Sequence, residues 1–210
     1  MNKKVSSILS IILPHKRINL FVLFIIILGI VSGTIFLLVL NETDKELVTN
    51  QITNFFSNIN TNNINNGQAF KSSIIQNLLF IILIWILGMS IVGIIANIFL
   101  IYMKGFIIGF SVSSFFIIYE YKGLLAGLIY LFPTTIISII VALILGSYSI
   151  MFTTTLWKQI FSKTKGNNFS FFLKKYFLVL GICIILGLGA SISESYLLPS
   201  VFKLFIKFFI

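Results

Sequence analysis

Charge is scarce in this chain of 210 residues: 10% of the residues are charged, and only five are acidic. Soluble domains usually carry about 25% charged residues. This deficit, together with 58% hydrophobic residues and several long apolar runs, excludes an ordinary water-soluble domain. A single cysteine, Cys183, excludes an intramolecular disulfide, and His15 has no second histidine with which to build a metal site.

The few acidic residues do not form a catalytic pattern. Three of them lie within residues 42–46, whereas Glu120 and Glu194 stand alone. Acid–base catalysis needs carboxylates that converge. The sequence also has no zinc-protease, serine-hydrolase, phosphate-loop or dinucleotide-binding motif. We therefore expect that the protein is not an enzyme and binds neither a cofactor nor a metal.

The net charge of +10 is carried mostly by basic residues between the apolar runs. This placement indicates membrane topology, so we expect the lipid bilayer as a partner and no nucleic acid. Ten basic residues, Lys104 among them, fall in segments assigned to the inside, and five fall in segments assigned to the outside. The bias predicts a membrane protein with its N-terminus inside and its C-terminus outside.

Hydropathy and turn signals predict an all-α, polytopic membrane protein that forms a single domain over 1–210. Lys-Gly pairs at 104–105, 122–123 and 165–166 are typical of helix ends and support the boundaries. The predicted transmembrane spans are 18–40, 74–102, 105–120, 123–156 and 176–198. The predicted connections are a cytoplasmic amphipathic segment 1–17, an outer loop 41–73, a basic cytoplasmic loop 157–175 and an interfacial tail 199–210.

The outer loop contains an apolar stripe with helical spacing. Val48, Ile52, Phe55, Phe56 and Ile59 recur on one face and predict an amphipathic helix over 45–60. Such a helix either lies on the membrane surface or receives a partner, and we favour the surface location. In the partner alternative, Phe55 and Phe56 are the candidate contacts.

Small residues mark candidate helix-packing positions. Closely spaced small residues let helix backbones approach in lipid. We favour packing within one bundle, and leave a homo-oligomer open as the alternative. The candidate packing residues are Gly88, Gly93, Gly105, Gly109, Pro133, Gly187, Ala190 and Ser191.

Two polar features in the apolar runs need an explanation. Pro133 is followed by Thr134 and Thr135, which either line a polar cavity or bond to backbone carbonyls freed by the proline. We favour the local bonding. Glu194 lies about 27 Å of helix beyond Tyr176, near the expected outer interface. We therefore interpret Glu194 as a packing and docking residue and keep a proton-relay role as the alternative.

The order of four segments resembles the stage II sporulation protein M family over essentially the whole chain. The segments are WILGMSIVG (85–93), YMKGFIIGFSV (102–112), YLFPTTI (130–136) and ASISESYLLP (190–199). By position, the resemblance implies roles for Gly105, Gly109, Pro133, Glu194 and Pro199. In the wider family a His-Gly pair often follows the proline. Here Thr134 and Thr135 follow it, which argues against transferring a channel-like role.

The resemblance implies a membrane scaffold that is required for engulfment during endospore formation. Such proteins reside in the bacterial cytoplasmic membrane, act at the septal membrane, and anchor two peptidoglycan-degrading partners, stage II sporulation proteins D and P. The candidate partner-contact residues are then Phe55, Phe56, Glu194 and Pro199. The alternative function is a small transporter or permease-like protein that uses the polar face around Pro133.

Overall fold

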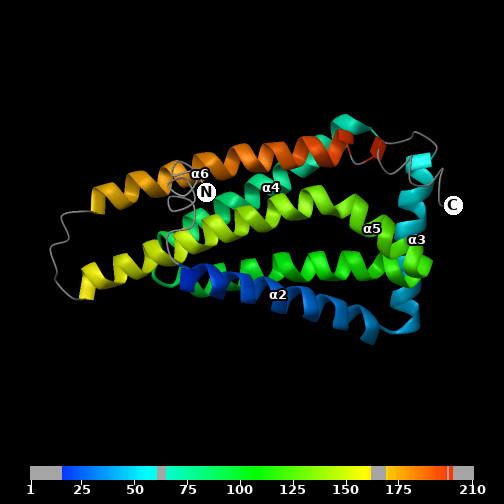
Figure 1. The fold of residues 1–210 in the computed structure, drawn as a ribbon, viewed down its shortest axis with the longest axis horizontal. Coiled ribbons are helices and arrows are strands. Elements are labelled where there is room, and N and C mark those ends of the chain that lie inside the picture. Colours follow the sequence, from blue (N-terminus) through cyan, green and yellow to red (C-terminus); the bar gives the residue numbers. More distant parts are fainter. Residues whose placement is uncertain (1–15, 61–64, 162–168, 198, 201–210) are drawn as a thin grey trace, which may run out of the picture.

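The long apolar segments form helices that lie side by side along one axis (Figure 1). The computed structural model describes residues 16–60, 65–161, 169–197 and 199–200. Of residues 55–56, 58–60, 118–133, 161, 169 and 197 it describes the backbone alone. The elements are α2 (Lys16–Val39), α3 (Glu42–Asn60), α4 (Asn66–Gly88), α5 (Gly93–Phe161), α6 (Phe169–Ile192) and a π-helical segment η1 (Ser193–Leu197). The described residues contain no strand, so the all-α prediction is confirmed.

Helix α5 is 69 residues long and doubles back on itself, so that its two legs lie side by side in Figure 1. Its first leg is Gly93–Ile117 and its second leg is Thr134–Ile160. The legs are antiparallel, since Asn97 on the first donates a hydrogen bond to Ser149 on the second. Within the described residues, five helical stretches are long and apolar enough to cross a membrane: α2, α4, the two legs of α5, and Ser170–Tyr196.

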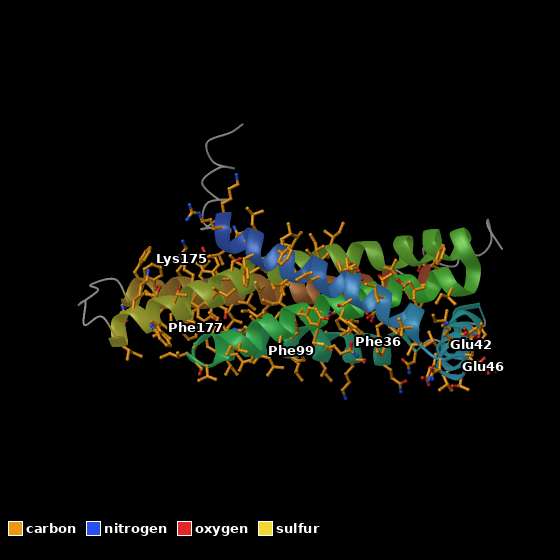
Figure 2. All side chains as sticks on the ribbon, turned by 90° about the horizontal axis from the view of Figure 1, so that it is seen from below. Phe36, Glu42, Glu46, Phe99, Lys175 and Phe177 are labelled. Atoms are coloured by element: carbon orange, nitrogen blue, oxygen red, sulfur yellow. The ribbon has the colours of Figure 1, made fainter. Side chains whose placement is uncertain are left out.

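The second leg of α5 forms the centre of the bundle. Of its apolar stretch 61% is buried, against 39% for Ser170–Tyr196 and 28% or less for the other three. Its side chains Leu145 and Tyr148 are at most 2% exposed and pack with Ile84 of α4 and Cys183 of α6. By contrast, large apolar side chains project from the sides, including Phe36, Phe99 and Phe177 (Figure 2). This distribution suits a bundle surrounded by lipid.

Helix α3 lies across one end of the bundle, which we call the α3 end (Figure 1). Glu42 and Asp44 occupy its first turn, where negative charge interacts favourably with the positive end of the helix dipole. Asn65 caps the next helix, because its side-chain oxygen accepts hydrogen bonds from the backbone N–H groups of Gly67 and Gln68 at 3.1 and 3.3 Å. Glu42 and Glu46 mark the α3 end in Figure 2, whereas Lys175 lies toward the opposite end.

The largest difference from the predicted boundaries concerns the span 74–102. The structure ends α4 at Gly88 and begins α5 at Gly93. The intervening turn is formed by Gly93 N–H donating to the Ser90 carbonyl at 3.2 Å, and a side chain at Gly93 would meet the Leu87 carbonyl. Because Met89, Ile91 and Val92 are apolar, this turn leaves no dip in hydropathy. The Lys104–Gly105 pair, predicted to be a turn, lies inside a helix.

The remaining boundaries differ less. Predicted spans 105–120 and 123–156 become the two legs of α5, displaced by the new turn, and the backbone stays helical through Pro133. Helix α6 begins at Phe169 rather than 176, so Lys174 and Lys175 are helical. The predicted segment 1–17 lies outside the described residues apart from 16–17, as does the tail 199–210 apart from 199–200.

Candidate functional site

Polar side chains from α4, α6 and η1 meet toward the α3 end of the bundle. Ser73 donates a hydrogen bond of 2.6 Å to Glu194 Oε2. Asn77 Nδ2 lies 3.0 Å from Ser191 Oγ and 3.4 Å from Ser73 Oγ. Ser73 and Asn77 share one face of α4 because they are four residues apart. This network joins α4 to the last turns of the chain's final described helix.

Glu194 is positioned by an irregular backbone. It lies in the π-helical segment η1, where Ser193 and Ser195 donate hydrogen bonds back to the carbonyls of Ala190 and Ser191 at 2.8 Å each. Short π-helical turns widen a helix locally and are frequent at functional sites. The carboxylate is half-buried and points to Ser73 on α4. The described hydrogen bond of Glu194 therefore lies inside the bundle, as expected for a packing residue, and the docking role stays a prediction.

A polar cavity of about 190 Å³ lies beside this network, between α4, η1 and both legs of α5. Lys104 of the first leg reaches it, and its ammonium nitrogen is 5.2 Å from the centroid of the Phe80 ring. Among the described residues, no salt bridge joins Lys104 to a carboxylate. The cavity is lined by Gln76, Asn77, Lys104, Ile107, Ile108, Ser111, Thr134, Thr135, Ser138 and Glu194.

The expectation for Lys104 changes with this cavity. Lys104 was assigned to an inner turn, yet it lies about 16 Å of helix beyond Gly93, near the middle of the first leg. The error follows from the displaced turn at 89–92. Thr134 and Thr135 both line the cavity, and their favoured bonding to local backbone carbonyls stays a prediction. Without Lys104, nine basic residues remain in inner segments against five in outer segments, so the sequence still predicts the N-terminus inside.

A second polar cluster lies toward the opposite end. Thr153 Oγ1 donates to the Gly88 carbonyl at 2.8 Å, and the Tyr176 hydroxyl donates to the Trp85 carbonyl at 2.9 Å. Asn97 is fully buried and hydrogen-bonds to Ser149. Within the described residues, its side-chain oxygen has no hydrogen-bond partner. Sequence analysis missed this cluster, because single Asn, Ser and Thr residues in apolar runs carry no periodic signal.

The predicted packing glycines lie at close helix contacts. A methyl group at Gly105 or Gly109 would collide with the backbone carbonyl of Ile26 or Ile30 on α2. Gly29 and Gly33 make the reciprocal contacts from α2. These two were missed, although their spacing is the same small-xxx-small signal. Gly88 faces Ser149 and Tyr176, and Gly187 faces Ile81. Ala190 and Ser191 are buried, and Gly93 serves the turn.

Several of these packing residues lie in the segments that carried the family resemblance, and comparison with known proteins supports that resemblance. The family profile described as stage II sporulation protein M matches residues 20–199. The chain belongs to the stage II sporulation protein M family. No curated protein and no solved structure matches it. The matched region contains every element from α3 to η1 and most of α2, and it includes both Lys104 and Glu194.

For this family member, the predicted partner contacts fall into three groups. Phe55 and Phe56 lie on α3, but their side chains are outside the described residues. Pro199 follows η1 and is half-buried. Glu194 faces Ser73. The described part of α3 instead forms an apolar groove of about 340 Å³ against the first leg of α5, lined chiefly by Leu47, Val48, Ile52, Phe110 and Phe115.

Proposed function

We propose that this member of the stage II sporulation protein M family is a membrane scaffold required for engulfment during endospore formation. In this role it anchors peptidoglycan-degrading partners, stage II sporulation proteins D and P, at the septal membrane. Bond cleavage falls to those partners, and this chain is not an enzyme. Family membership supports the sporulation role. The orientation predicted from basic residues would place α3 outside, next to the peptidoglycan.

The observation that carries the scaffold proposal is the position of α3 across the end of the bundle (Figure 1). Most of its described side chains are polar, and Leu47 is 64% exposed beside the apolar groove. A helix anchored to the bundle yet open along one side can receive an amphipathic segment of another protein. The apolar helices of the bundle, across whose end α3 lies, would then hold such a partner at the bilayer.

Co-purification from sporulating cells tests the scaffold. Tagged full-length chain should recover a peptidoglycan-degrading protein. Leu47→Asp combined with Ile52→Asp, or Phe55→Asp combined with Phe56→Asp, should reduce that recovery about tenfold or more, as for loss of interface anchors. Thr53→Asp is the matched control, because Thr53 is exposed on the same helix. Recovery of no such protein by the wild-type chain would contradict the proposal, as would equal loss with the Thr53 variant.

A second candidate function is a small permease, and the cavity favours it. Thr134, Thr135 and Ser138 line the same cavity as mid-leg Lys104. Ionisable residues inside membrane spans usually mark substrate or ion pathways. In proteoliposomes, Thr134→Ala and Thr135→Val should lower solute flux if the chain is a carrier and should leave partner recovery unchanged. No flux through the wild-type chain, together with unchanged partner recovery in these variants, would favour the scaffold alone.

A further inference from the structure

The polar cavity holds one group of each charge type. Lys104 supplies an ammonium and Glu194 a carboxylate, yet no salt bridge joins them in the described residues. Lys104 is half-buried near the middle of its leg, where charge is costly unless it is partnered. The contact found for its ammonium is the Phe80 ring. A cation–π contact supplies less compensation than a carboxylate or another anion.

Helix α4 sets the spacing of the two charges. Ser73 holds the Glu194 carboxylate, and Phe80 lies beneath the Lys104 ammonium. Seven residues of helix separate Ser73 from Phe80, which is about 10 Å along the axis. This arrangement holds the ammonium and the carboxylate at different points along α4, and among the described residues no salt bridge joins them. It leaves room for a small molecule that contacts both.

The charge pattern restricts the class of ligand. A net anion would be attracted to Lys104 but repelled by Glu194. A net cation would be attracted to Glu194 but repelled by Lys104. An apolar molecule would leave the Lys104 ammonium without an anionic partner inside the bundle. We propose that the cavity binds a small zwitterion, with its anionic group toward Lys104 and its ammonium group toward Glu194, the two joined by a short carbon linker.

The rest of the lining suits such a ligand. Asn77 and Gln76 offer amide groups on the α4 side, and Ser111 and Ser138 offer hydroxyls on the two legs of α5. The volume of about 190 Å³ is that of a small metabolite rather than a peptide or a sugar chain. Ile107 and Ile108 can cover the linker. Two sources share this chemistry: a free amino acid and the headgroup of an ethanolamine phospholipid.

This inference deepens the permease candidate, since a carrier must bind its cargo, and it does not depend on the scaffold role. Binding without flux would leave the site in place and refute transport alone. Loss of partner recovery in the α3 variants would leave the zwitterion site untouched. The binding assay is therefore read separately from flux and from co-purification.

The test uses full-length chain purified in detergent and radiolabelled alanine and β-alanine as probes. N-acetylalanine, which lacks the ammonium, and alanine amide, which lacks the carboxylate, serve as competitors. In a second arm, nanodiscs containing equal phosphatidylethanolamine and phosphatidylglycerol are opened in a native mass spectrometer, and the retained lipid is identified. We expect retention of a labelled amino acid or of phosphatidylethanolamine, and we expect each single-charge competitor to be about tenfold weaker or worse.

Lys104→Met and Glu194→Gln should each lower retention about tenfold or more, the effect of losing one charged hydrogen bond. Lys71→Met and Glu46→Gln are the matched controls, because both residues are exposed and outside the cavity. Retention of neither amino acid nor ethanolamine lipid would overturn the proposal. Equal potency of the single-charge competitors on the wild-type chain would overturn it as well, and that arm stands even if a variant fails to fold.

Discussion

The contact between α2 and the first leg of α5 yields the sharpest stability prediction. Gly29 and Gly33 on α2 interlock with Gly105 and Gly109 on α5. A Cβ added at Gly29 would lie 2.9 Å from the backbone nitrogen of Phe106 and 3.0 Å from the Cα of Gly105. Backbone atoms cannot rotate away as a side chain can. We therefore expect Gly29→Ala or Gly105→Ala to push the two helices apart.

The magnitude follows from comparison with a glycine that touches nothing. Overpacking a close contact costs about 1–3 kcal/mol. Replacing a helical glycine by alanine also lowers backbone entropy in the unfolded state, which stabilises by up to about 1 kcal/mol. Gly181 and Gly189 on α6 have no atom within 4 Å of an added Cβ, so alanine there should show the second effect alone. The difference between Gly105→Ala and Gly181→Ala should therefore be about 1–3 kcal/mol.

Equilibrium unfolding in mixed detergent micelles measures these free energies, with Trp85 and Trp157 as fluorescent probes. Gly29→Ala combined with Gly105→Ala should cost less than the sum of the single changes, because one displacement of α2 relieves both clashes. The control pair at Gly181 and Gly189 should be additive. If Gly105→Ala were as stable as Gly181→Ala, the close helix contact would be refuted.

Three further predictions follow from named contacts. Ser73→Ala should destabilise by about 1–3 kcal/mol, because a hydrogen bond to a carboxylate is lost, while exposed Ser72→Ala should be neutral in the same unfolding assay. Tyr176→Phe should lower the free energy of unfolding by about 1 kcal/mol, because the hydrogen bond to the Trp85 carbonyl is lost while the ring still stacks on Phe152. A decrease of more than about twice that value would indicate disrupted packing instead. On intact cells, a membrane-impermeant maleimide should label Thr53→Cys but reach Ser170→Cys only after permeabilisation. The native Cys183 is buried and should stay unlabelled. Labelling of Ser170→Cys but not of Thr53→Cys on intact cells would reverse the proposed orientation.

Sequence analysis predicted the number of helical stretches correctly but misplaced one turn. Apolar runs of sufficient length must form helices in a bilayer, because the backbone has no other hydrogen-bond partners there. The turn between Gly88 and Gly93 escaped because its residues are as apolar as the helices it joins. Because that turn was misplaced, the sequence did not reveal that Lys104 lies near the middle of a leg, where it lines the cavity.

The candidate site was predictable only in part. Glu194 and Thr134 stood out in the sequence as polar residues in apolar surroundings, yet nothing local indicates that they line one cavity. Ser73 and Glu194 are 121 residues apart, and their contact depends on how α4 packs beside the final helix. Gly29 and Gly33 could have been found from their spacing, but their partners on α5 could not.

The sequence by itself determined an all-helical membrane protein of the stage II sporulation protein M family, because hydropathy, basic residues and ordered motifs are local properties of the chain. Tertiary structure alone decided which polar groups meet. Side-chain contacts between helices depend on rotation and crossing geometry, which hydropathy does not encode. For that reason the pairing of Ser73 with Glu194, and the cavity that Glu194 shares with Lys104, became visible only once the helices were packed.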